Sequence, residues 1–205
     1  LGFYPDFPEI RLKITGKGPD RERLKREMKG FQDVICGEIG EYVYSEIDES
    51  LEEVVGKLLT EQNATLSVAE SCTGGLITHR LTNVAGSSRY VERSVVVYSN
   101  KAKEELLNVP FNLIEKFGAV SEPVARSMAQ GVRLLAGTTY GLAVTGIAGP
   151  TGGSREKPVG TVFVGVSTET ATRVTHNRFY GSRERVKMMS AQTCLSLLKD
   201  TIQSD

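Results

Sequence analysis

The sequence predicts a layered α/β sheet domain, an α/β/α sandwich, preceded by a small α+β domain. From residue 50 onward, short β-branched stretches alternate with helical stretches, and such alternation is typical of a sheet covered by helices on both faces. Residues 1–49 are rich in charge instead. The pattern Ser50-x-x-Glu53 is a capping box that marks the start of a helix. We therefore place the domain boundaries at 1–49 and 50–205.

The first domain is predicted to contain two strands and one helix. Polar and apolar residues alternate over 10–14, which indicates a strand, and a charged helix is expected from Asp20 to Lys29. Tyr42-Val43-Tyr44 suggests a second strand. A unit of this length is too short to bury a large core by itself.

In the second domain, strands and helices are predicted to alternate along the chain. Its first helix begins at the capping box, with an apolar face that starts at Leu51. Buried strands are expected at 65–69 and 94–98, another strand at 140–145, and a pair of strands at 159–167 and 173–180. Further helices are expected at 75–81, 100–107, 110–117, 122–136 and 182–203. A glycine-rich loop covers 146–158.

The composition argues against several classes of protein. Lys plus Arg number 25 and Asp plus Glu number 25 in 205 residues, which leaves no charge excess to attract nucleic acid or an acidic membrane. Three cysteines, far apart and odd in number, favour a reducing, cytoplasmic compartment. His79 and His176 lack metal-ligand spacing, so no metal site is expected. No apolar run is long enough to span a bilayer.

The segment from Glu70 to Gly75 follows the first predicted strand of the sheet and opens a helix. Ligands of α/β sheets bind at the carboxyl ends of strands. The turn offers the Ser71 hydroxyl and the Cys72 thiol, and the amides at the helix N-terminus could stabilise an oxyanion. A plain tight turn, in which Ser and Thr only cap the helix, is the competing interpretation.

A second motif, Tyr98 to Lys103, follows the next strand and should lie at the same sheet edge. A nucleophilic serine without a nearby histidine needs another base. Lys103 can serve if burial, or a cation such as Lys101 or an arginine, lowers its pKa. A solvated helix face with Asn100 as a cap is the alternative, and for Lys101 we favour it.

Two further segments suggest an anionic ligand. The glycines between Gly146 and Gly153 would let backbone amides approach a phosphate or ribose. Arg183, near the start of the last helix, suits an anion. A connecting loop and a solvated first turn remain the plain alternatives. Together the motifs indicate covalent acyl transfer on a small polar, phosphorylated substrate, without metal ligands.

Five motifs, in order and spacing from about Leu51 to Gln203, resemble the CinA family. They are Ala69–Gly75, Tyr98–Lys103, Gly118–Glu122, Thr145–Pro150 and Glu156–Val162. The resemblance implies a metal-independent and cofactor-independent nicotinamide mononucleotide (NMN) deamidase of pyridine nucleotide (NAD) salvage. Such an amidohydrolase converts NMN to nicotinate mononucleotide and ammonia.

The same resemblance implies roles for individual residues. Ser71 would be the nucleophile, with Lys103 and Tyr98 in proton transfer. The substrate would be bound by Thr73, Gly74, Gly75, Asn100, Thr145, Gly146, Gly149, Gly152, Gly153 and Arg183. Thr151 stands where the family usually has glycine, and Ser182 where it favours aspartate.

Residues 1–49 resemble the KH-type linker domain of full-length CinA proteins, but they lack the Gly-x-x-Gly loop that clamps RNA. A structural or dimer-contact role, and a homo-oligomer, are therefore expected. Full-length relatives also carry an N-terminal domain similar to molybdopterin-binding folds. Two alternatives to the serine deamidase stay open: a hydrolase that uses Cys72, and a catalytically silent regulatory domain that binds a pyridine nucleotide.

Overall fold

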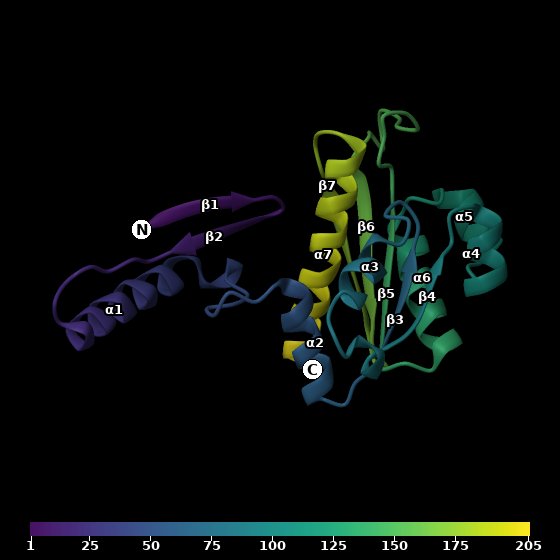
Figure 1. Ribbon diagram of the computed structural model, residues 1–205. Helices are drawn as coiled ribbons and strands as arrows, with labels where there is room; N and C mark the ends of the chain where they lie inside the picture. Colours follow the sequence, from purple (N-terminus) through teal and green to yellow (C-terminus); the bar gives the residue numbers. More distant parts are fainter. The chain divides into compact units, whose positions relative to one another are not determined.

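The computed structural model describes residues 1–205 and divides the chain into two compact units, residues 1–49 and 50–205. In the first unit, β1 (Gly2–Asp6) and β2 (Glu9–Lys13) form an antiparallel hairpin (Figure 1). Helix α1 (Arg21–Ile39) follows, with Asp20 as its side-chain cap. None of the residues 1–49 is buried, as expected for so short a unit.

The prediction of a strand at residues 42–44 was wrong. The chain there leaves a 3-10 helix, η1 (Gly40–Tyr42), and pairs with no other strand. The partner of β2 is β1 instead, a strand that the sequence analysis missed. Helix α1 also runs about ten residues beyond its predicted end at Lys29. Three residues are too short a stretch for a reliable strand prediction. In the β1–β2 hairpin, by contrast, every strand residue has a pairing partner.

The second unit contains a five-stranded mixed sheet, which confirms the predicted fold class. The strand order is β4-β3-β5-β6-β7. The strands are β3 (Leu66–Glu70), β4 (Val91–Val96), β5 (Tyr140–Gly146), β6 (Thr161–Ser167) and β7 (Thr172–Arg178). Strand β3 runs parallel to both β4 and β5, whereas β6 runs antiparallel to its neighbours β5 and β7. The carboxyl ends of β3, β4 and β5 therefore meet at one edge of the sheet.

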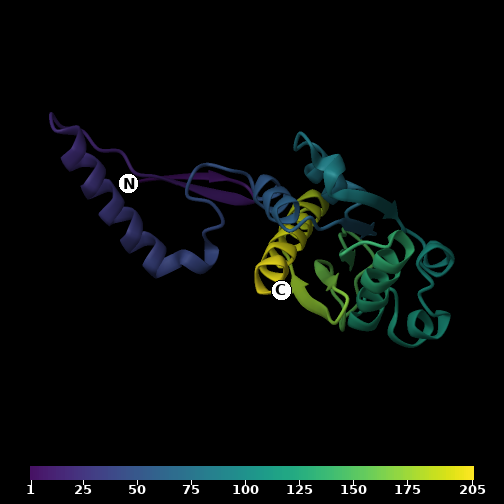
Figure 2. The ribbon, with the colours of Figure 1, turned by 90° about the horizontal axis from the view of Figure 1, so that it is seen from below.

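Helices cover both faces of this sheet (Figures 1 and 2). One face carries α6 (Glu122–Ala136), beside which lie α4 (Asn100–Leu107) and α5 (Phe111–Phe117). The other face carries α2 (Leu51–Glu61), α3 (Leu76–Thr82) and α7 (Arg183–Ser204), and a short 3-10 turn, η2 (Ser87–Arg89), precedes β4. None of the helices combines the length and apolar character needed to cross a membrane.

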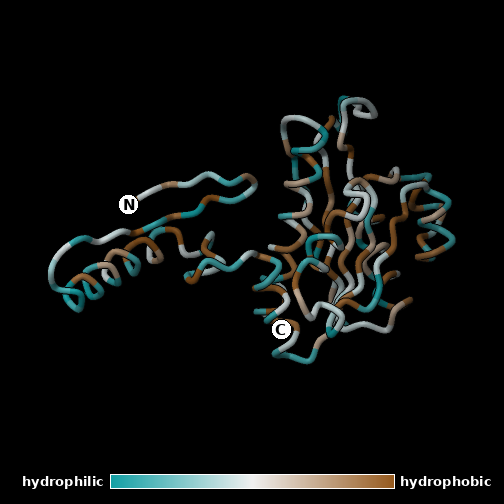
Figure 3. The backbone as a smooth tube through the Cα atoms, viewed as in Figure 1, coloured by the Kyte–Doolittle hydropathy of each residue, from teal (hydrophilic) through white to brown (hydrophobic).

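The central strands are buried, and Figure 3 shows that hydrophobic residues, in brown, are frequent along them. All five residues of β3 are buried. Helix α6 packs so closely on β5 that a Cβ at Gly141 would lie 2.3 Å from the carbonyl oxygen of Ala129. Burial on both faces makes this sheet a rigid support for the segments that leave its edge.

Helix α2 begins without help from the preceding residues. Ser50 Oγ accepts from the amide of Glu53 at 3.3 Å, and the Glu53 carboxylate accepts from the amide of Ser50 at 2.8 Å. Both halves of the predicted capping box are thus present. The buried side chains of Leu51, Val55 and Leu59 belong to a helix that packs on α7 of the same unit.

A shortened chain that begins at Asp48 should therefore fold on its own. We expect one cooperative thermal transition, with a midpoint within about 4 °C of the second unit's transition in the full chain, which corresponds to about 1 kcal/mol. Circular dichroism and calorimetry of both chains would measure this. A non-cooperative transition in the shortened chain would show that residues 1–49 supply part of the second unit's stability.

Candidate active site

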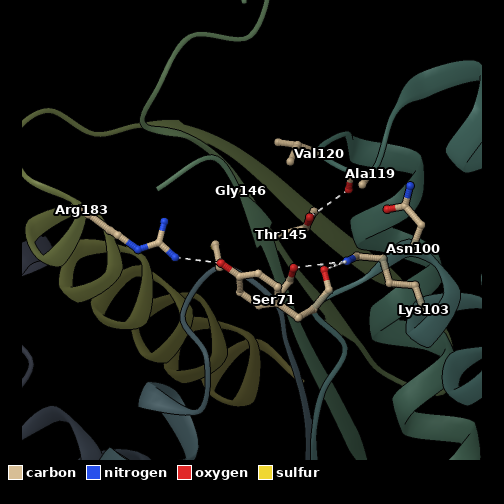
Figure 4. Close-up of a pocket in the computed structure, with 10 residues that line it drawn as sticks. Ser71, Asn100, Lys103, Ala119, Val120, Thr145, Gly146 and Arg183 are labelled. Atoms are coloured by element: carbon tan, nitrogen blue, oxygen red, sulfur yellow. Dashed lines mark hydrogen bonds between the residues drawn. The ribbon is translucent and has the colours of Figure 1, made fainter. Parts of the chain in front are cut away.

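The segments that leave β3, β4 and β5 enclose a cavity of about 170 Å³ (Figure 4). Its lining brings together residues that lie far apart in the sequence: nine come from four of the five predicted motifs, and the tenth is Arg183 at the start of α7. These residues are Ser71, Cys72, Tyr98, Asn100, Lys103, Ala119, Val120, Thr145, Gly146 and Arg183. The cavity thus lies at the sheet edge where the sequence analysis expected a ligand.

Ser71 and Lys103 face each other in this cavity (Figure 4). Ser71 follows β3 directly, whereas Lys103 lies in the first turn of α4, whose cap is the Ser99 hydroxyl. Lys103 Nζ lies 3.2 Å from Ser71 Oγ. The two residues are only 1% (Lys103) and 8% (Ser71) exposed. The amine is therefore within hydrogen-bonding distance of the hydroxyl and shielded from bulk water.

Burial lowers the pKa of Lys103 below its ordinary value of 10.5, and the nearby Cys72 thiol opposes this effect weakly. No carboxylate pairs with the ammonium to reverse the shift. Lys101 does not supply the predicted cationic influence, since its side chain is 80% exposed and pairs with Glu105 at 3.5 Å. The interpretation of Lys101 as part of a solvated helix face is confirmed.

The contacts of Lys103 suit a neutral amine. Its Nζ lies 2.8 Å from the carbonyl oxygen of Val97 and 3.4 Å from that of Tyr98. Carbonyl oxygens only accept hydrogen bonds, so both N–H groups of a neutral amine can be used there. The remaining tetrahedral position is the lone pair, and the third neighbour is Ser71 Oγ. Neutral Lys103 can therefore accept the hydroxyl proton of Ser71.

Cys72, the alternative nucleophile, is in a different environment. Burial raises the pKa of its thiol to about 12, so the thiol is protonated near neutral pH. A Cβ at Gly146 would lie 3.1 Å from Cys72 Sγ and 2.7 Å from a methyl carbon of Val162. The thiol thus packs close to the β5 backbone. This environment disfavours thiolate chemistry.

The fully buried Glu70 was missed by the sequence analysis. Its carboxylate accepts hydrogen bonds from the amides of Gly75 (2.9 Å), Ile77 (3.2 Å) and Thr78 (2.9 Å). It also accepts from the hydroxyl of Thr78 at 2.7 Å. These amides open α3, so Glu70 occupies the donors that were expected to stabilise an oxyanion. Because it precedes the helix by five residues, it does not match the usual N-cap spacing.

Two other amides of the turn remain free. The amide of Ser71 donates to the Val144 carbonyl and that of Gly74 to the Ser71 carbonyl, both at 3.1 Å. The amides of Cys72 and Thr73 donate to no oxygen of the protein, and that of Cys72 lies close only to its own thiol sulfur. The hydroxyl of Thr73 is likewise buried without a partner. Donors next to Ser71 are therefore not used by the protein's own oxygens, and of these two residues Cys72 lines the cavity.

Replacing Glu70 with alanine should destabilise the protein strongly. Four hydrogen-bond donors would lose their acceptor, at about 1–3 kcal/mol for each buried group that stays unsatisfied. We expect the free energy of unfolding to fall by at least about 3 kcal/mol in urea titrations. Glu92→Ala, an exposed change on β4, should shift it by no more than about 0.5 kcal/mol. Equal stability of the two variants would contradict this role of Glu70.

Arg183 connects three segments around the cavity. Its guanidinium donates to the carbonyl oxygen of Gly149 and to the phenol oxygen of Tyr98, both at 2.8 Å. The Tyr98 side chain is 60% exposed. Its phenol hydrogen-bonds Arg183 rather than Ser71 or Lys103, and only the Tyr98 carbonyl contacts Lys103. The structure thus places Tyr98 in the cavity but not in direct contact with the Ser71–Lys103 pair.

Thr145, at the end of β5, donates its hydroxyl to the carbonyl oxygen of Ala119 at 2.9 Å. Ala119 and Val120 were not among the predicted site residues, although they belong to the motif at residues 118–122. Asn100 lines the cavity from the first position of α4. The motif at residues 118–122 was the signal that could have identified Ala119 and Val120, but its sequence does not indicate which group would contact a ligand.

Several predicted substrate-binding residues lie outside the cavity lining: Thr73, Gly74, Gly75, Gly149, Gly152 and Gly153. Gly74 and Gly75 have φ of 64° and 97°, which glycine adopts without strain. Gly153 packs closely, since a Cβ there would lie 2.6 Å from the amide nitrogen of Val159. These observations give the glycines conformational roles, and their contacts with substrate remain predictions.

Comparison with known proteins places this chain in a family. Residues 48–202 match the model of the CinA C-terminal domain. The chain belongs to the CinA family. The "CinA-like protein" of Syntrophus aciditrophicus is 49% identical over 200 residues, which cover 97% of this chain and 48% of that protein. That of Desulfotalea psychrophila is 42% identical over 205 residues, covering 100% and 50%. This CinA chain therefore spans about half the length of these curated relatives.

Solved CinA structures match the second unit. The competence/damage inducible protein CihA from Agrobacterium tumefaciens superposes with a TM-score of 0.70 at 38% identity, covering 78% of this chain and 99% of that one. The competence damage-inducible protein A (ComA) from Klebsiella pneumoniae gives a TM-score of 0.73 at 31% identity, covering 75% and 95%. These matches confirm the mixed-sheet α/β fold of the CinA domain.

Proposed function

We propose that this CinA-family chain is an amidohydrolase that converts NMN to nicotinate mononucleotide and ammonia. The observation that carries the proposal is the contact of Ser71 Oγ with the buried amine of Lys103 at 3.2 Å. Burial lowers the pKa of that amine, which is the requirement for a lysine that acts as a general base. The pair needs neither a histidine nor a metal ion to activate the serine.

The cavity also suits a small anionic amide. Lys103 and Arg183 line it and no Asp or Glu does, so its charge favours a phosphorylated ligand. Its volume of about 170 Å³ is below the 300–1,000 Å³ of typical small-molecule sites. A pyridine carboxamide fits such a space better than a whole nucleotide does. The carboxamide would therefore enter the cavity and the phosphate would stay outside.

The proposed reaction has two halves. Neutral Lys103 takes the proton of Ser71 as Oγ attacks the carboxamide carbon, and the free amides of Cys72 and Thr73 stabilise the oxyanion. The intermediate breaks its C–N bond, and the Lys103 ammonium returns the proton to the departing ammonia. Water, deprotonated by Lys103, then hydrolyses the ester and restores Ser71. The sum is amide plus water to carboxylic acid plus ammonia.

Tyr98 and Thr145 are proposed to hold the substrate and assist proton transfer. The phenol oxygen of Tyr98 accepts from Arg183, so its own O–H remains free to donate to the substrate. The Thr145 hydroxyl donates to Ala119, which leaves its lone pairs free to accept from the carboxamide N–H. Asn100 supplies a further amide group at the cavity lining.

The direct test is ammonia release from NMN by the full chain with EDTA present. We expect stoichiometric ammonia and nicotinate mononucleotide, the latter identified by chromatography. EDTA is included because the structure gathers no group of three His, Cys, Asp or Glu side chains that could hold a metal ion. NMN binding without ammonia would instead favour a silent regulatory domain, and loss of activity only with EDTA would contradict the serine–lysine mechanism.

A further inference from the structure

Lys187 lies beside the nucleophile turn but has no function in the scheme above. It follows Arg183 by one turn of α7, on the same helix face. A Cβ built at Gly74 would lie 3.7 Å from Lys187 Nζ. Lys187 is half-buried and forms no ion pair or hydrogen bond within the protein. A cation is thus held near Ser71 without a countercharge.

The surface beside this cation is open. A Cβ at Gly74 would meet only Lys187 Nζ within 4 Å, and one at Gly75 would meet only a methyl carbon of Val96, at 3.9 Å. The backbone of these two glycines can therefore be approached closely by a ligand. We call the open surface over Gly74 and Gly75 the glycine shelf. An ammonium group at the border of an exposed backbone suits an anion such as phosphate.

Arg183 is less available to an anion than Lys187. Two nitrogens of its guanidinium already donate to Gly149 and Tyr98. In the binding mode proposed above, the phosphate of the mononucleotide lies outside the cavity of about 170 Å³. Lys187 and the glycine shelf lie next to the turn that carries Ser71. Lys187 is thus a cationic group beside that turn with no partner of its own.

We propose that Lys187, together with the glycine shelf, binds the phosphate of the substrate and makes the enzyme prefer a nucleotide over its nucleoside. This inference rests on the proposed deamidase function and adds a specificity determinant to it. Lys187 acts in binding rather than in the chemical step, because it contacts neither Ser71 nor Lys103. Its loss should therefore raise KM for NMN and leave kcat nearly unchanged.

The experiment compares NMN with nicotinamide riboside, the nucleoside without phosphate, as substrates of the full chain. Lys187→Gln should raise KM for NMN about tenfold, the value of one hydrogen bond to a charged group. It should change kcat/KM for the nucleoside less than twofold, and Lys187→Arg should restore most of the NMN affinity. Inorganic phosphate should compete with NMN in the wild type and about tenfold more weakly in Lys187→Gln.

Lys199→Gln is the matched control. It removes the same charge from the same helix about 18 Å further along, at 1.5 Å per residue, where Lys199 pairs with Asp200 at 2.9 Å. That distance exceeds the Debye length of about 8 Å at physiological salt. The control should therefore behave as the wild type with both substrates and with phosphate.

Three outcomes would overturn the proposal. An unchanged KM for NMN in Lys187→Gln would show that the phosphate binds elsewhere. Equal losses of kcat/KM with both substrates would show that Lys187 acts in the chemical step or supports the conformation of the Ser71 turn. If the nucleoside reacts too slowly to measure, an inhibition constant for inorganic phosphate that is the same in Lys187→Gln and wild type would contradict the proposal. Failure of the proposed function looks different: the wild type would release no ammonia from NMN. Calorimetric titration of wild type and Lys187→Gln with inorganic phosphate would then test the site alone.

Discussion

Ser71→Ala should lower ammonia release from NMN at least about 1,000-fold, because loss of the nucleophile removes the covalent step. In a well-studied serine protease, loss of the nucleophile lowers kcat by up to about 10⁶-fold. Binding should persist, since the other lining groups remain, so KM or the dissociation constant of NMN is expected to change little. Steady-state ammonia release and calorimetric binding of NMN to the same preparation would measure both quantities.

Cys72→Ala is the informative companion to this variant. Burial raises the pKa of the Cys72 thiol to about 12, so little thiolate exists at neutral pH, and most of the activity should remain. The two side chains are neighbours in one turn, and each change removes a single heavy atom. Retained activity in Ser71→Ala together with its loss in a folded Cys72→Ala protein would transfer the nucleophilic role to the thiol.

Local sequence signals predicted most elements of the second unit. The bounds of α4 (Asn100–Leu107) and α6 (Glu122–Ala136) were predicted correctly. The Ser99 side chain caps α4, whereas α6 begins without a side-chain cap and is marked by its apolar period. Strand β4 begins three residues earlier than predicted, since exposed residues of this edge strand interrupt its apolar run. The first unit was harder to predict because it buries no residue, so no periodic core pattern marks its strands.

The site could be predicted only in part for a related reason. Ser71 and Lys103 follow strands and Thr145 lies at the end of one, so the rule for strand ends predicted that they meet at one edge of the sheet. The roles of Glu70 and Lys187 depend on groups that meet only in the folded chain: the amides at the start of α3 and the glycine turn opposite α7. Neither residue type is distinctive in sequence, since most carboxylates and lysines are solvated.

Lys103→Ala is expected to reduce kcat about 100-fold or more, the range for removal of a general base. Lys103→Arg should restore little, because a guanidinium stays protonated at working pH. Lys101→Ala, an exposed change on the same helix, should leave the rate unchanged and serves as the control. An active Lys103→Arg enzyme would show that a positive charge, rather than a neutral amine, is what the reaction needs.

The pH dependence provides a second, independent test of Lys103. Burial lowers its pKa in the folded protein below 10.5, and only the neutral amine can accept the Ser71 proton. The rate should therefore rise with pH through this lowered pKa and level off above it. The same shift means that the unfolded chain binds the proton more tightly, so stability should also rise with pH between the lowered value and 10.5. Both the rising limb of kcat and this gain in stability should disappear in Lys103→Ala. If the limb persists in that variant, another group titrates, and Lys103 is not the base.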